Sequence, residues 1–250
     1  SFGPPTDDAK VEINVRAAKI PDDDRLEAAM YARGLEDVLP QLFSREQYDR
    51  LLDAGLVVTS SAHAAAQRTL DTLTREGRTN SPEADVQRRI LATPVFDLGG
   101  PLDVAVRIWR EYGTAGEWFD EVNIALPDVG VLLDVLPYPM RVKGATISQA
   151  NNVATVSGGT YTGLRGGDIA IGALVDFERI RKAGGEFVPD VDATANNLPT
   201  DDLLLFALPS VGAEDAKRPL REWLAPLNPQ GTVKASATLR LTDKGTTNYD

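Results

Sequence analysis

The sequence lacks cysteine altogether and contains one histidine and two methionines among its 250 residues. Without cysteine, the chain has no disulfide, thiolate nucleophile, iron–sulfur cluster or cysteine-ligated zinc. Any histidine general base, catalytic triad or histidine metal site would depend on His63 alone. Because His63 lies among alanines near the start of an expected helix, we interpret it as a packed or partly solvated helical residue.

Basic residues are scarce relative to acidic ones, with 26 Lys and Arg against 37 Asp and Glu and a net charge of −11. Capture of nucleic acid by bulk charge requires an excess of cations, so we expect no direct binding of that kind. Apolar residues make up 42% of the chain, which predicts a sizeable core. A chain of this length buries roughly 70–75% of its unfolded surface and needs no metal or disulfide to fold.

Long apolar runs are also missing. The longest, Val129–Leu136 (broken by Gly130 and Asp134) and Leu203–Leu208, are shorter than the roughly 18 residues of a membrane-spanning helix, so we expect no membrane span. Ser1–Pro5 has neither the basic nor the apolar segment of a signal peptide, and we expect none in this chain. The first residue is not Met, which fits a processed product or a piece of a longer protein. These features leave the compartment open.

Helical signals dominate from about residue 22 to about residue 119. Capping residues followed by apolar residues at helical spacing predict five helices there. Their expected first or capping residues are Asp22, Ser44, Ser60 or Ser61, Ser81 and Gly100. The last of them would place Leu102, Ala105 and Trp109 on one face and end at Gly113.

Alternation of apolar and polar residues predicts strands near both termini and in the second half of the chain. The expected strands are Val11–Arg16, Val122–Leu126, Ala145–Ser148, Val153–Val156, Ile169–Ile171 and Val233–Thr242. Asn151 and Asn152 mark the turn of a hairpin between two of them. Leu203–Leu208 is either a strand or a helical turn, and residues 185–201 are expected to be irregular.

This order of elements predicts an α+β fold, in which a helical N-terminal half (about residues 22–119) packs on a mainly antiparallel β region (about residues 120–242). Amphipathic strands would lie near both termini. No flexible linker marks the change of pattern near residue 120, so we expect a single domain over residues 1–250. A division into residues 1–119 and residues 120–250 is the alternative.

The acidic segment that begins at Asp190 fits two ligand-binding patterns. Asp190 to Thr194 match the Asp-x-Asp-x-Thr core of haloacid-dehalogenase-type phosphotransfer motifs, but Pro189 precedes them where a hydrophobic strand is required. Oxygen-bearing side chains also recur at the spacing of a twelve-residue calcium-binding loop. The candidate calcium ligands are Asp190, Asp192, Thr194, Asn196 and Asp201. Ala195 occupies the position where such loops need glycine, so a solvated acidic loop is the simpler interpretation.

Glycine is concentrated in the segment Gly158–Gly167. Backbone amides of such a segment can bind a phosphate group, but neither known glycine-rich phosphate motif is present. We interpret the segment as a mobile surface loop. Its Tyr161 and Arg165 are the candidate contacts with a partner chain.

Acidic residues also lie next to aromatic ones, where Glu117, Asp120 and Glu121 flank Trp118 and Phe119. A carboxyl group beside aromatic rings can have a raised pKa and line a sugar site. An acid-based hydrolase of carbohydrate or phosphate, using Asp and Glu with or without calcium, is therefore one functional hypothesis. A short amphipathic turn with solvated charges accounts for the same residues.

The features that are present favour a non-catalytic structural protein. An extended N-terminal arm, amphipathic strands near both ends and a glycine-rich segment are typical of subunits that dock through strand edges and loops. The sequence therefore predicts a subunit of a larger assembly, of shell, virion or scaffold type, whose partners are copies of itself or other protein subunits. It assigns no catalytic residue and no cofactor apart from the calcium alternative, and the hydrolase remains the second hypothesis.

Overall fold

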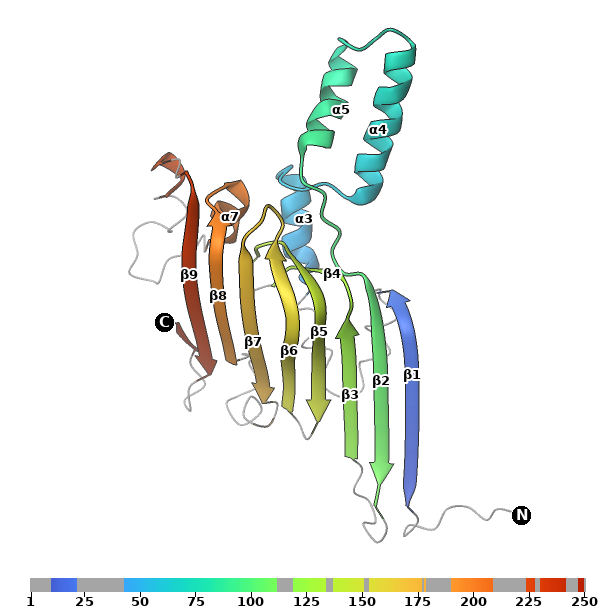
Figure 1. The fold of residues 1–250 in the computed structure, drawn as a ribbon, viewed down its shortest axis with the longest axis vertical. Coiled ribbons are helices and arrows are strands. Elements are labelled where there is room, and N and C mark those ends of the chain that lie inside the picture. Colours follow the sequence, from blue (N-terminus) through green and yellow to red (C-terminus); the bar gives the residue numbers. More distant parts are fainter. Residues whose placement is uncertain are drawn as a thin grey trace, which may run out of the picture.

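A large antiparallel sheet dominates the protein, with short helices gathered at one end (Figure 1). The computed structural model describes residues 10–21, 43–111, 119–133, 137–150, 153–176, 178, 190–208, 224–227, 230–241 and 247–249. The strands are β1 (Val11–Pro21), β2 (Pro101–Arg110), β3 (Phe119–Leu126), β4 (Val129–Val131), β5 (Met140–Ala150), β6 (Val153–Gly163), β7 (Asp168–Asp176), β8 (Asp190–Pro199), β9 (Thr232–Leu241) and β10 (Thr247–Tyr249).

The strands follow one another through the sheet almost in chain order. Their order is β1-β2-β3-β5-β6-β7-β8-β9-β10, and β4 pairs with β5 beside this path. The helices among the described residues are α3 (Arg45–Asp53), α4 (Ser60–Arg75), α5 (Pro82–Ala92) and α7 (Asp202–Ala207), with a 3-10 turn, η2, at Ala225–Leu227. The architecture is therefore a meander of antiparallel strands with helices at one end of the sheet.

The predicted fold class, a helical N-terminal half packed on a β region, is wrong. The helix expected from Gly100 is strand β2, paired with β1 on one side and β3 on the other. Leu102, Ala105 and Trp109 fit helical spacing, but Leu102 also begins an alternating series with Val104 and Val106. The β-branched members of that series favour the extended backbone, and pairing on both sides settles the choice. The helix expected from Asp22 lies outside the described residues.

Three predicted helices are confirmed. Ser44 caps α3 by accepting a hydrogen bond from the Gln47 backbone N–H, and Ser81 caps α5 in front of Pro82. The cap of α4 is Thr59, one residue before the expected serines. The capping box at Ser44 is only half formed, because the Ser44 N–H donates to the Leu132 carbonyl at 3.0 Å. That bond ties the start of α3 to the sheet.

The β region contains more strand than the sequence predicts. The expected hairpin is confirmed, since β5 and β6 are antiparallel partners and Ala150 pairs with Val153. The short strand at Ile169 extends over Asp168–Asp176, and the segment expected to be irregular contains β8. Leu203–Leu208 is helical over α7, as one of the two alternatives stated. Helical spacing in the sequence also predicts a helix over Asp176–Ala183 and a short one from Pro219, and both fall mostly outside the described residues.

The two faces of the sheet differ in polarity. One face contains the fully buried apolar side chains, among them Ile124 and Ile147 in the middle of the sheet. Helices α3 and α7 cover the upper end of this face, where Leu51 and Leu203 are both 0% exposed and belong to the same apolar cluster as Met140. We call this face the core face. The opposite face displays mostly small and polar side chains.

A glycine-lined kink crosses β5 and β6. Gly144, Gly158 and Gly159 have φ angles of 73°, 69° and 78°, which side chains with a Cβ rarely adopt. The alternation of side chains shifts by one residue there, since Val142 and Ile147 are both buried although an odd number of positions separates them. Gly159 has no room for a side chain, because a Cβ would lie 2.7 Å from the Cβ of Ala145.

Helices α4 and α5 form a hairpin that stands clear of the sheet (Figure 1). They pack against each other through buried Ala66, Leu73 and Ala84. At the base of the hairpin, the Val58 N–H donates a hydrogen bond to the Pro94 carbonyl at 3.0 Å. This bond joins the two segments that connect the hairpin to the rest of the protein. The helical hairpin is thus a projection with its own small core.

Candidate functional site

The sheet has an open edge at β1. This strand pairs with β2 along one side, and none of the described residues pairs with its other side. An edge strand presents a row of unpaired N–H and C=O groups that can accept a further strand. β1 is therefore the place where the described part of the sheet can be extended.

The core face continues to this edge, where its side chains are more exposed than in the middle of the sheet. Val11, Ile13, Val15 and Ala17 share it with the β2 residues that they oppose, which include Ile108 opposite Ile13 and Val106 opposite Val15. Ile13 is 48% exposed and Val15 is 55% exposed, although comparable side chains in the middle of the same face are buried. The edge therefore exposes apolar surface where a neighbouring strand would cover it.

The other face of β1 displays Glu12, Asn14 and Arg16. Hydrogen bonds from the side chains of Asn14 and Arg107, at 3.1 and 3.0 Å, hold the pKa of Glu12 below its usual value, so the carboxylate is ionised at neutral pH. The Arg107 guanidinium also lies 4.6 Å from the ring centre of Trp109. Arg16 makes no ion pair within the described part of the chain. The face therefore offers one positioned acid and one available cation.

A bulge ends the regular part of β1. The pairing with β2 shifts between Ala17 and Ile20, and Lys19 has a φ of 56°. The Lys19 backbone N–H donates to the Asp103 carboxylate at 2.7 Å, which holds this conformation. Because a bulge interrupts the ladder, the stretch of β1 that can pair regularly with another strand is Val11–Ala17.

The opposite edge of the sheet is partly closed. β10 pairs with β9 at Leu239–Leu241, and the remainder of β9, Thr232–Thr238, has no partner on its outer side among the described strands. The polar side chains of that stretch are Thr232, Lys234, Ser236 and Thr238. This second edge therefore contains a cation and three hydroxyl groups but no acid.

The residues predicted to bind calcium are not brought together. Asp190, Asp192, Thr194 and Asn196 lie on strand β8, where alternate residues share a face but stand roughly 6.5–7 Å apart along the strand. Asp201 instead caps α7, accepting a hydrogen bond from the Leu204 N–H at 3.0 Å. Across the described ranges, no three acidic or histidine side chains are grouped as metal ligands. The expected loop is absent because small apolar residues between the acids pair as a strand.

The two residues predicted to contact a partner chain, Tyr161 and Arg165, make contacts within their own chain instead. Tyr161 is 7% exposed and lies on β6, so the expected mobile loop is instead a strand followed by a turn. Arg165, in that turn, forms an ion pair with Asp201 at 3.3 Å. The structure thus joins a predicted partner contact to a predicted calcium ligand, and their pairing fastens the β6–β7 turn to the start of α7.

Tyr138 lies beside this ion pair. Its burial raises its pKa to about 12, with a further raising effect from Asp201 and a lowering effect from Arg165. An unfolded chain releases the tyrosine proton near pH 10 whereas the folded chain retains it, so a rising pH lowers the free energy of the unfolded state relative to the folded state. We predict that Tyr138 contributes a loss of stability of roughly 2–3 kcal/mol between about pH 10 and pH 12.

The measurement is the free energy of urea unfolding across that interval for the wild type and for Tyr138→Phe. The variant should lose less stability than the wild type as the pH rises, since it has no phenol to ionise at this position. Equal losses in the two proteins would contradict the prediction.

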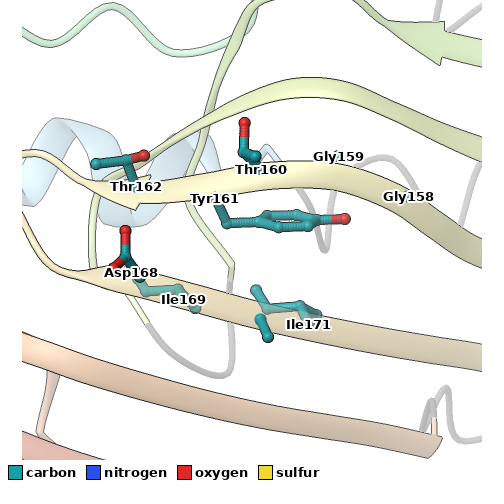
Figure 2. A pocket seen from close by; sticks show the side chains of 9 residues that line it. Gly158, Gly159, Thr160, Tyr161, Thr162, Asp168, Ile169 and Ile171 are labelled. Atoms are coloured by element: carbon teal, nitrogen blue, oxygen red, sulfur yellow. The ribbon is translucent and has the colours of Figure 1, made fainter.

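A shallow hollow of about 410 Å³ opens where the pairing between β6 and β7 is interrupted, between Val156 and Tyr161 (Figure 2). The ring of Tyr161 lies along β6, between that strand and Ile171 of β7, while Thr160 and Thr162 point away from it. Asp168 is the one carboxylate that lines the hollow. A second hollow, of about 350 Å³, lies beside β1 and also has one carboxylate, Asp103. Neither contains the pair of acids that glycoside hydrolysis requires.

The remaining predicted residues are dispersed. Phe119, Asp120 and Glu121 belong to strand β3 and not to a solvated turn, whereas Glu117 and Trp118 lie outside the described residues. Phe119 stacks on Trp109 of β2 with ring centres 5.6 Å apart. His63 is half-buried in the first turn of α4, on the helical hairpin. These positions do not converge on a common site.

The sequence predicted strand edges as the docking element but missed two features of β1. The bulge at Lys19 has no signal in the sequence, because it depends on the bond to Asp103, far away in the chain. The sequence shows that an acid, an amide and a base alternate at Glu12, Asn14 and Arg16. Their role in pairing can be inferred only once β1 is known to be an edge strand.

Comparisons with family models, curated proteins and solved structures find no match to this chain. Among the described residues, no helix is long and apolar enough to span a membrane.

Proposed function

We propose that the protein is a non-catalytic assembly subunit that joins a neighbouring protein chain through the open edge of β1. One observation supports this function above the others: the core face reaches the edge, where Ile13 and Val15 are about half exposed. Burial of apolar surface drives association, and an added strand also satisfies the free backbone groups.

The regular part of this edge has little protection against pairing. Natural edge strands are usually guarded by prolines, by charged residues that point toward the core, or by bulges. Between Val11 and Ala17 there is no proline, and every core-face residue is apolar. The bulge at Lys19 limits the length of the pairing and leaves the stretch Val11–Ala17 available.

The test is to place a charge on the core face of the edge. In Val15→Lys the ammonium group would have to be buried by an added strand, so we expect association to weaken at least tenfold, which corresponds to about 1.4 kcal/mol. Analytical ultracentrifugation over a range of concentrations measures the change. The wild type should form multimers at concentrations where the variant is monomeric.

The matched control is Val86→Lys, which changes a valine that is 47% exposed on α5, in the helical hairpin that stands clear of the sheet (Figure 1). Thermal unfolding shows whether each variant remains folded. Equal weakening by both substitutions, or a wild type that stays monomeric alone and with candidate partner proteins, would overturn the proposal.

A further inference from the structure

We infer that the partner at this edge is a second copy of the same chain, paired β1 to β1 about a two-fold axis that passes beside Asn14. This inference rests on the proposed function and adds the identity and the register of the partner. The observation behind it is that Val11–Ala17 is chemically self-complementary when it is paired with itself in antiparallel orientation.

The register follows from the two faces of the strand. A two-fold axis perpendicular to the sheet makes the two β1 strands antiparallel and keeps both core faces on the same side. With Asn14 opposite the partner's Asn14, Ile13 lies opposite the partner's Val15 and Val11 lies opposite the partner's Ala17. Each half-exposed apolar residue thus meets another across the axis.

The charges agree with the same register. Glu12 lies opposite the partner's Arg16, and the symmetry repeats this pair on the other side of the axis. Glu12 is ionised and Arg16 has no ion-pair partner in the described part of its own chain. Directly opposed residues of unlike charge stabilise an antiparallel pair.

Neighbouring registers lose this match. A shift that keeps the core faces aligned moves the pairing by two residues. In one direction Arg16 comes opposite the partner's Lys10, and in the other direction Glu12 comes opposite the partner's Ala18. Only the register centred on Asn14 forms both acid–base pairs.

The length of the regular part of β1 is also consistent with a two-fold axis beside Asn14. Val11 is the first residue of β1 and Ala17 is the last one before the bulge, and each is three positions from Asn14. The bulge therefore ends the pairing at the same distance from the axis as the start of the strand does.

The other edge of the sheet is a poorer partner for β1. In a head-to-tail arrangement β1 would pair with Thr232–Thr238 of β9, whose polar side chains include a lysine but no acid. Arg16 would find no carboxylate there. In the in-face register that places Asn14 opposite the partner's Lys234, Val11–Arg16 pair within Thr232–Thr238 and Ala17 falls opposite the partner's Gly231.

A single introduced cysteine tests the symmetry directly, because the chain has no cysteine of its own. Across the proposed axis Asn14→Cys faces its own copy, with Cβ atoms about 4.5–5.5 Å apart. A short bifunctional maleimide should therefore convert this variant to a covalent dimer. Lys234→Cys, on the other edge, should give no dimer by itself or in a mixture with Asn14→Cys.

The outcomes separate this inference from the proposed function. Crosslinking that appears only when Asn14→Cys and Lys234→Cys are mixed would show head-to-tail pairing, which overturns the two-fold axis and leaves the assembly function intact. Multimers that form without any crosslink would also overturn the two-fold axis and leave the assembly function intact. A protein that stays monomeric alone and with candidate partner proteins would overturn both.

Exchange of the two charges tests the register. Arg16→Glu places like charges opposite each other in both pairs and should weaken self-association at least tenfold, and so should Glu12→Arg. A mixture of the two variants restores opposite charges in both pairs, so heterodimers should form with close to wild-type affinity. Lys234→Glu is the control and should have no effect. If the mixture does not recover, the register is wrong.

Discussion

Gly130→Ala should destabilise the protein by roughly 2–5 kcal/mol, through overpacking and the loss of two backbone hydrogen bonds. A Cβ at Gly130 would lie 2.0 Å from the Asp97 carbonyl oxygen and 3.1 Å from the ring of Phe96. Gly130 and Gly99 exchange two backbone hydrogen bonds, at 2.8 and 2.9 Å. The segment before β2 must therefore move away from β4, which breaks both bonds and opens the surrounding core.

The same substitution at Gly172 provides the control. Gly172 lies within β7, and a Cβ there would have no atom within 4 Å. Gly172→Ala should change stability by less than about 1 kcal/mol in either direction. Urea unfolding followed by tryptophan fluorescence, at equal protein concentrations, gives both values. A Gly130→Ala protein as stable as Gly172→Ala would show that the segment before β2 can shift without loss.

Leu51→Ala should remove roughly 2–5 kcal/mol, because it leaves a cavity under a helix that depends on packing. Helix α3 has nine residues, too few to be stable alone in water. Leu51 is 0% exposed and joins α3 to the buried cluster that includes Leu132 and Leu203. Loss of its side chain should therefore loosen α3 before the rest of the sheet, which amide hydrogen exchange of Tyr48–Leu52 would detect.

Leu227→Ala makes the same chemical change at a site that is 71% exposed. It should alter the free energy of unfolding by less than about 0.5 kcal/mol. A similar loss of stability from both substitutions would mean that α3 is not held by the burial of Leu51.

Local chemistry in the sequence was sufficient for several elements. The caps at Ser44 and Ser81 act on backbone groups three residues away, and β5 and β6 are adjacent in sequence. Such elements are determined within a few residues. This explains why α3, α5 and the β5–β6 hairpin were predicted from the sequence.

Strand β2 shows why the fold class was not predictable. Its apolar residues fit the spacing of a helix as well as the alternation of a strand, and the choice depends on β1 and β3, which flank it in space. In β8 the alternation was hidden, because its core-face residues include Ala193 and Ala195, which are small and weakly apolar. The strand conformation of β8 is determined by its pairing with β7 and β9 more than by its own side chains.

The candidate site was predictable in kind but not in position. Amphipathic strands near both termini pointed to edge pairing, and Val11–Arg16 does form a strand at an edge. By contrast, Arg165 was predicted to contact a partner chain and Asp201 to bind calcium, although the two side chains bind each other across 36 positions of the sequence. Contacts at that separation follow from the topology of the sheet, which the sequence pattern did not reveal.

The helical hairpin of α4 and α5 gives the proposed dimer a recognisable outline. The hairpin projects beyond the end of the sheet at which β1 finishes (Figure 1). A two-fold axis beside Asn14 reverses one copy, so the two projections would extend from opposite ends of the joined sheet and point away from each other. Such a particle is long and has a protruding tip at each end, so it should sediment more slowly than a compact body of equal mass.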